Sequence, residues 1–184
     1  MKKSMKALML AAASFFAVNG WGAYAAEPAD TLQLEYKLHG QTRRFRCVFL
    51  PDGNGGVTLE WGIERNLKWW SGSYHMTPEA MERGDSMSFV MPEDGNHITL
   101  APAETFAAVS REALRRLRSE GRFVYDGVEY TAGGENRVCE LGALLHVVDS
   151  QEGCEMWILD SEECPVVWEM RGNPLEINWR TRRL

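Results

Sequence analysis

The chain has 184 residues, and the part after residue 25 has the length of one domain with one substantial core. Three lysines and no acidic residue fall in the first 25 positions, so the remainder carries 17 basic and 26 acidic side chains, a net charge of −9. This balance argues against nucleic acid as the main partner and against a purely electrostatic hold on anionic lipid, because both need a basic surface.

The first 25 residues have the pattern of a secretion signal. Lysines at positions 2, 3 and 6 precede an apolar run over residues 7–18, and the small residues Ala23 and Ala25 flank Tyr24. We expect cleavage after Ala25 and export to the periplasm or the medium. The apolar run is too short for a typical membrane span, so no span should remain after cleavage, although an uncleaved anchor is the alternative.

Alternation of apolar and polar residues, the strand period, dominates the rest of the chain. Strands are predicted at residues 32–38, 45–49, 57–63, 67–76, 86–91, 97–100, 123–125, 128–130, 139–149, 154–160, 165–171 and 175–182. Turn sequences separate them, and Asp126-Gly127 predicts a two-residue type I′ hairpin.

Two short helices interrupt the strands. Thr77 is the expected N-cap of the first helix, and Pro78 is its first helical residue. This helix should end near Arg83. Ser110 predicts the N-cap of a second helix, which Gly121 ends.

About ten closely spaced strands and two short helices predict a mainly β fold. We expect an antiparallel meander that forms a barrel, half-barrel or sandwich, as a single exported domain over residues 26–184.

An even number of cysteines in an exported protein suggests disulfides. Their pairing stays open, because four cysteines allow three connectivities; the candidates are Cys47, Cys139, Cys154 and Cys164. We expect no metal site, because neither C-x-x-C nor H-x-x-H spacing occurs, and no cofactor.

Tryptophans supply the candidate binding residues. Trp69 and Trp70 are adjacent, so in a regular strand they point to opposite faces. At most one of them enters a conventional core, and the other faces a ligand cavity, a second layer or solvent. The alternative for the tryptophans as a group is an ordinary barrel core.

The C-terminal meander contributes three more candidates, Met156, Trp157 and Trp168. If Cys164 lies opposite Leu159, then Trp157 and Trp168 share one face and Met156 lies on the other. Both faces are then partly apolar, and such a sheet is either covered on both sides or encloses something.

No catalytic motif is present. The paired acids lie in turns, where solvation keeps them from the unlike environments that acid–base catalysis needs, and no G-x-S-x-G occurs. We therefore expect no enzymatic activity.

The run from Cys154 to Asp160, a short turn, and the run from Pro165 to Met170 resemble the closing strands of exported all-β periplasmic domains and of half-barrel lipoprotein carriers. The resemblance covers about residues 140–180. It implies a curved sheet whose concave face holds an acyl chain, and it assigns no binding residue.

Together these patterns predict an exported, non-enzymatic binding protein. Its expected ligand is lipid-like, either apolar or amphipathic, against a curved sheet lined by Trp, Met and Leu. One alternative is a protein-interaction or inhibitor module that binds a secreted partner through an edge strand or an aromatic patch. Another is a carbohydrate-binding module with exposed tryptophans.

Overall fold

The computed structural model describes residues 30–38 and 40–184, which form fourteen strands and two helices. The predicted signal segment lies outside the described residues. The strands are β1 (Leu32–Leu38), β2 (Gln41–Pro51), β3 (Val57–Arg65), β4 (Lys68–Met76), β5 (Ser86–Met87), β6 (His97–Thr99), β7 (Glu104–Thr105), β8 (Arg122–Tyr125), β9 (Val128–Ala132), β10 (Arg137–Cys139), β11 (Gly142–Asp149), β12 (Glu155–Leu159), β13 (Val167–Arg171) and β14 (Ile177–Arg183). The helices are α1 (Pro78–Arg83) and α2 (Arg111–Glu120).

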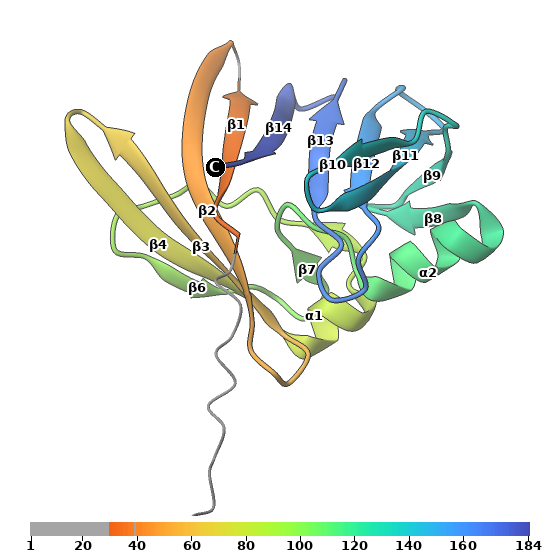
Figure 1. Cartoon of the computed structure of the whole chain (residues 1–184), viewed down its shortest axis with the longest axis horizontal. Coiled ribbons are helices and arrows are strands. Elements are labelled where there is room, and N and C mark those ends of the chain that lie inside the picture. Colours follow the sequence, from red (N-terminus) through yellow and green to blue (C-terminus); the bar gives the residue numbers. More distant parts are fainter. Residues whose placement is uncertain (1–29, 39) are drawn as a thin grey trace, which may run out of the picture.

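Twelve of these strands form one large sheet, which confirms the predicted mainly β fold (Figure 1). Its order is β6-β4-β3-β2-β1-β14-β13-β12-β11-β9-β8, with β10 also paired to β11. Neighbours are antiparallel except β4 and β6, and β5 pairs with β7 in a separate parallel sheet. The order has two ends, so the described strands make an open sheet and not a closed barrel.

The first and last strands meet in the middle of this sheet. β1 pairs with β14 along its whole length, from Leu32 opposite Arg183 to Leu38 opposite Ile177. In Figure 1 they lie side by side, orange and dark blue, between a half built from β2, β3 and β4 and a half built from β8 to β13. This pairing joins the two halves.

Several local predictions are confirmed. Asp126 and Gly127 both have positive φ, 53° and 74°, as a type I′ turn requires. Ser110 Oγ accepts a hydrogen bond from the Ala113 N–H at the start of α2, and Gly121 closes that helix at φ 70°. Thr77 caps α1 in the same way as Ser110 caps α2.

Several predicted strands differ from the structure in their bounds, and three of these differences bear on the fold. The strand expected from residue 67 begins at Lys68, because Asn66 and Leu67 have positive φ and make a two-residue turn. The strand expected over residues 86–91 ends at Met87. The strand expected over residues 139–149 is two, β10 and β11, joined by a tight turn that places Cys139 opposite Gly142.

The predicted pairing of Cys164 with Leu159 is wrong. In the structure Trp157 lies opposite Glu169 and Ile158 opposite Val167, so the register shifts between them and Trp168 is the extra residue. A bulge of this kind cannot be read from alternation, because it breaks the alternation itself.

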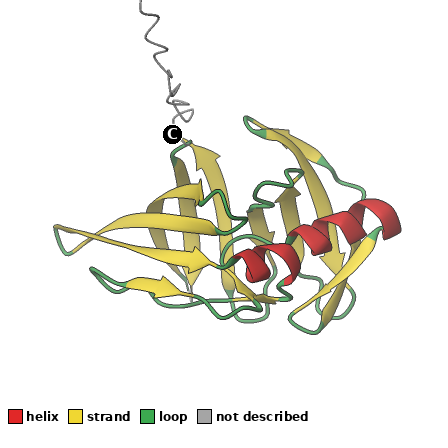
Figure 2. Ribbon diagram, turned by 90° about the horizontal axis from the view of Figure 1, so that it is seen from below, coloured by secondary structure: helices red, strands yellow, loops and turns green. Residues whose placement is uncertain are grey.

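The inner face of the sheet carries the core. Val57, Leu59, Trp61 and Ile63 alternate along β3 and are all buried there. The two helices lie close together along one end of the strands (Figure 2). The buried residues of α2 are Ala113, Leu114 and Leu117.

Candidate ligand-binding site

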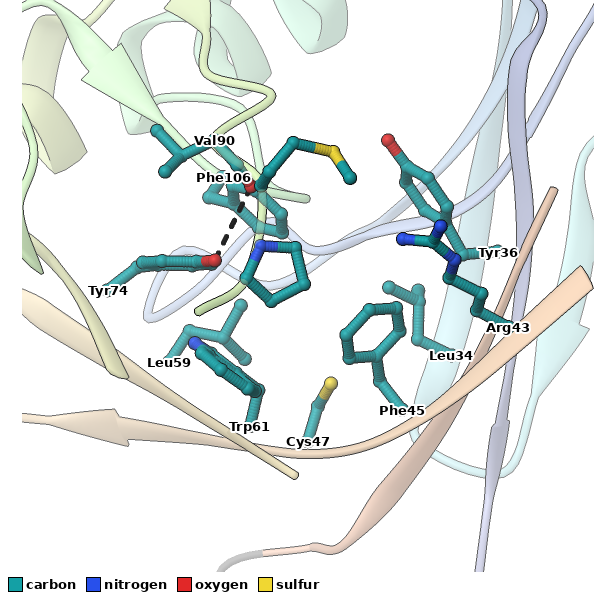
Figure 3. A pocket seen from close by; sticks show the side chains of 12 residues that line it. Leu34, Tyr36, Arg43, Phe45, Cys47, Leu59, Trp61, Tyr74, Val90 and Phe106 are labelled. Carbon is teal, nitrogen blue, oxygen red and sulfur yellow. Dashed lines mark hydrogen bonds between the residues drawn. The ribbon is translucent and has the colours of Figure 1, made fainter. Parts of the chain in front are cut away.

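A small cavity lies between the inner faces of β1 to β4 and a segment that crosses them (Figure 3). Its walls include Leu34, Phe45, Cys47 and Leu59. The volume is about 30 Å³, room for about one or two water-sized groups. In this closed form the site cannot admit a long chain.

Strand alternation explains why these side chains meet. Leu34 lies opposite Phe45, and Leu59 opposite Tyr74, so every second residue of four neighbouring strands faces the same interior. The lining is therefore a property of the pairing and not of any single strand.

A row of aromatic rings follows the cavity. Successive ring centroids are 6.2 Å apart from Tyr36 to Phe45, 6.4 Å from Phe45 to Trp61, 5.8 Å from Trp61 to Tyr74 and 4.7 Å from Tyr74 to Phe106. The first two contacts are edge-to-face, a favoured geometry for aromatic pairs. The row gives the cavity a long, apolar floor.

Residues 89–92, here called the cover segment, close the cavity. Val90, Met91 and Pro92 line it, although Met91 is half exposed on its other side. The cover segment pairs with no strand, and Tyr74 Oη donates a hydrogen bond of 3.4 Å to the Val90 carbonyl. This is a long contact for a hydroxyl donor, so hydrogen bonding attaches the segment only weakly, although Phe89 and Val90 pack against the core.

Both ends of the cover segment are anchored more firmly. The Ser88 N–H donates to the Thr105 carbonyl at 2.7 Å. On the other side the Gly95 N–H donates to the Ser71 carbonyl at 2.8 Å. Short, firm anchors on either side of a weakly held stretch suit a flap that moves outward without unfolding the sheet.

The polar groups of the cavity are few. The buried Trp61 Nε1 has no hydrogen-bond partner. Tyr36 and Arg43 stand at one side of the cavity in Figure 3, where they form a cross-strand pair. Burial raises the pKa of the Cys47 thiol to about 12, so this cysteine is neutral and a poor nucleophile.

The adjacent tryptophans point to opposite faces, as their positions require. Trp70 lies opposite the buried Ile63 and faces inward, with the Arg65 guanidinium 4.5 Å from its ring centre. Trp69 faces outward and is 54% exposed. Its ring covers Gly62, where a Cβ would overlap it.

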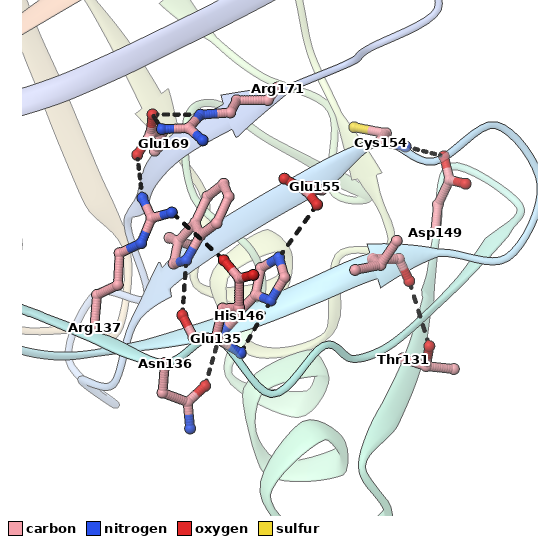
Figure 4. Close-up of polar contacts among 12 residues, drawn as sticks. Thr131, Glu135, Asn136, Arg137, His146, Asp149, Cys154, Glu155, Glu169 and Arg171 are labelled. Atoms are coloured by element: carbon pink, nitrogen blue, oxygen red, sulfur yellow. Dashed lines mark hydrogen bonds and ion pairs between the residues drawn. The ribbon is translucent and has the colours of Figure 1, made fainter.

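The three candidates from the C-terminal meander are buried in the other half of the sheet. Trp157 stacks on His146, with ring centroids 4.5 Å apart, and the Arg137 and Arg171 guanidiniums lie 3.9 and 4.8 Å from its ring centre. Glu169 joins the two arginines, at 3.0 and 2.7 Å (Figure 4). The face of the sheet that carries Trp157 is therefore covered by the side chains of Arg137, Glu169 and Arg171.

None of the five predicted binding residues lines the cavity; they are Trp69, Trp70, Met156, Trp157 and Trp168. Sequence reasoning missed Tyr36, Phe45 and Trp61. The alternation of residues 32–38 and 45–49 carries a signal for Tyr36 and Phe45, because each lies on the apolar side of its strand.

The predicted disulfides are absent from the structure. All four cysteines are free, and they lie on separate strands and loops. Cys154 has a hydrogen bond with the Tyr130 side chain, and the Cys139 sulfur accepts the Leu141 N–H at 3.4 Å.

Neither a metal-binding cluster nor a membrane-spanning helix occurs among residues 30–38 and 40–184. In these ranges no group of three or more His, Cys, Asp or Glu side chains is arranged to hold a metal ion. No helix in the same ranges is long and apolar enough to cross a bilayer.

No protein-family model matches the chain, and neither a curated protein nor a solved structure matches it significantly.

Proposed function

We propose that the protein is an exported, non-enzymatic binding protein that holds an apolar or amphipathic ligand on the inner face of β1 to β4. The observation that carries this proposal is the aromatic row from Tyr36 to Phe106 beneath the weakly attached cover segment. A concave, mostly apolar site with few polar groups is the usual form of a small-molecule site.

An amphipathic ligand fits better than a purely apolar one. Tyr36 and Arg43 place a hydroxyl and a guanidinium at one side of the cavity, whereas the wall beside them is mostly apolar and aromatic. A ligand with a polar head at these two residues and an alkyl part over the rings uses both surfaces.

Entry requires the cover segment to move outward, because the closed cavity is far smaller than any chain. The long Tyr74–Val90 hydrogen bond is the contact that this movement breaks. The sheet itself stays paired, so the opening changes only the cavity and its cover.

The alternatives have less support in the geometry. Sugar stacking needs a free ring face. The Trp69 ring packs over Gly62, and the Arg46 guanidinium lies 5.5 Å from the ring centre. A protein-binding patch needs contiguous apolar surface. The most exposed apolar side chains, Leu67 and Val138, lie singly at a turn and in the short strand β10.

Thiol alkylation tests the proposal without a labelled ligand. Cys47 lines the cavity and is buried, whereas Cys139 lies outside the cavity and serves as the internal control. We expect decan-1-ol to slow iodoacetamide labelling of Cys47 severalfold at pH 9 and to leave Cys139 unchanged, as followed by peptide mass spectrometry. Equal labelling of Cys47 with and without saturating decanol would contradict the proposal.

A further inference from the structure

Arg43 is a half-buried cation without an acidic partner among the described residues. Its Nη2 donates to Gln41 Oε1 at 3.4 Å, which is a long contact. Arg43 forms no ion pair with any of the described residues. By contrast, the next residue on the strand, Arg44, points to the outer face and pairs with Glu35 at 3.2 Å. A partly desolvated charge without a counter-ion is costly, and an anion beside Arg43 would offset that cost.

Tyr36 places a second donor at the same position. It lies directly opposite Arg43 in the β1–β2 pairing, on the same face, and Figure 3 shows both side chains at one side of the cavity. Burial raises the pKa of the Tyr36 phenol although the Arg43 charge opposes it, so the hydroxyl keeps its proton at neutral pH. Two donors beside an apolar cavity match the two oxygens of a carboxylate.

We propose that the ligand is a single-chain amphiphile with a carboxylate head. The carboxylate accepts hydrogen bonds from the Arg43 guanidinium and the Tyr36 hydroxyl, and the alkyl chain lies along the aromatic row beneath the cover segment. This inference rests on the proposed function and names the chemistry of its ligand.

Two ligands with the same alkyl chain but different head groups separate the contribution of the head group to binding from that of the chain. Decanoate and decan-1-ol are titrated into the purified protein by calorimetry at pH 8, where the acid is ionised. We expect decanoate to bind about tenfold more tightly, since hydrogen bonds to a charged group are among the stronger ones.

Arg43→Met should lower decanoate affinity far more than decanol affinity and so abolish this preference, because methionine keeps the apolar stem but removes the charge. Arg44→Met is the matched control, since it removes the same charge from the outer face of the same strand, and it should keep the preference. Tyr36→Phe should reduce the preference about two- to fivefold without removing it, the loss of one hydrogen bond. That variant tests the head site independently if Arg43→Met folds poorly.

The outcomes are distinct. Equal binding of decanoate and decanol by the wild type, or a preference that survives Arg43→Met, would overturn the carboxylate inference and leave the cavity as a binding site. If Arg44→Met loses the preference for decanoate as fully as Arg43→Met does, the preference comes from overall charge, and the inference is overturned as well. Binding of neither ligand would overturn the proposed function itself.

Discussion

Tyr74 Oη donates to the Val90 carbonyl at 3.4 Å, and this hydrogen bond joins the floor of the cavity to its cover. Tyr74 is buried, and burial raises the pKa of its phenol to about 12, so the hydroxyl is a neutral donor across the physiological range. The closed state of the site is therefore held by one long hydrogen bond, which water can replace, and by the packing of Phe89 and Val90 against the core.

Tyr74→Phe should open the cavity more often with little loss of global stability. One long hydrogen bond contributes about 1 kcal/mol or less, so Cys47 alkylation should accelerate about two- to fivefold. The measurement is peptide-resolved labelling beside urea denaturation of the same sample. Unchanged Cys47 labelling would show that this contact does not hold the cover segment closed.

Gly62→Ala should destabilise the protein through Trp69. A Cβ at this position overlaps the indole ring, and forcing such a contact costs about 1–3 kcal/mol. In a Trp69→Ala background the same substitution should cost much less, because the obstacle is gone. Urea denaturation of the wild type and the three variants in this cycle measures the coupling, and additive effects would exclude the contact as the cause.

Glu169→Gln should be far more destabilising than an equivalent change on the surface. The Glu169 side chain is 11% exposed and joins Arg137 to Arg171 over the Trp157 ring. Both guanidiniums are partly solvated, so the expected cost is about 1–3 kcal/mol.

Glu79→Gln is the control for that change. Its pair with Arg83 is exposed on both sides, so its loss should change the stability little. Equal losses in the two variants would mean that the cluster around Trp157 is not a stabilising unit.

Ionised Asp149 should stabilise the fold near neutral pH, and this stabilisation should be lost in acid. Burial alone would raise the pKa of its carboxyl, but the backbone N–H groups of residues 151–154 donate to it and hold the pKa below its usual value. A lowered folded-state pKa gives stabilisation that is complete above the unfolded value, about 3.9, and is lost as the pH falls through the folded value.

Asp149→Ala should therefore be less stable than the wild type near pH 7, and the difference should shrink below about pH 4. Urea denaturation from pH 7 to pH 2.5 measures it. A difference that stays constant over the whole range would contradict the assigned ionisation.

Local chemistry made part of this fold predictable. Asp126-Gly127 can adopt positive φ at both turn positions, and Ser110 with Gly121 supplies both caps of α2, so these elements follow from short stretches of sequence. Residues 86–91 were expected to form one strand, yet residues 89–91 cross the cavity without pairing.

The candidate site was less predictable because it depends on pairing. Tyr36 and Arg43 meet through one hairpin, but the full row to Phe106 needs four strands and a distant segment in contact. Trp157 looked available for binding, and only the arginines that reach it from β10 and β13 show that it is enclosed.

Native mass spectrometry of the purified protein with excess decanoate tests ligand binding most directly. We predict one bound decanoate per chain, with extra mass that disappears on denaturation, and weaker retention in Arg43→Met than in Arg44→Met. A bare chain at saturating decanoate and decanol would contradict the binding cavity and favour a protein partner instead.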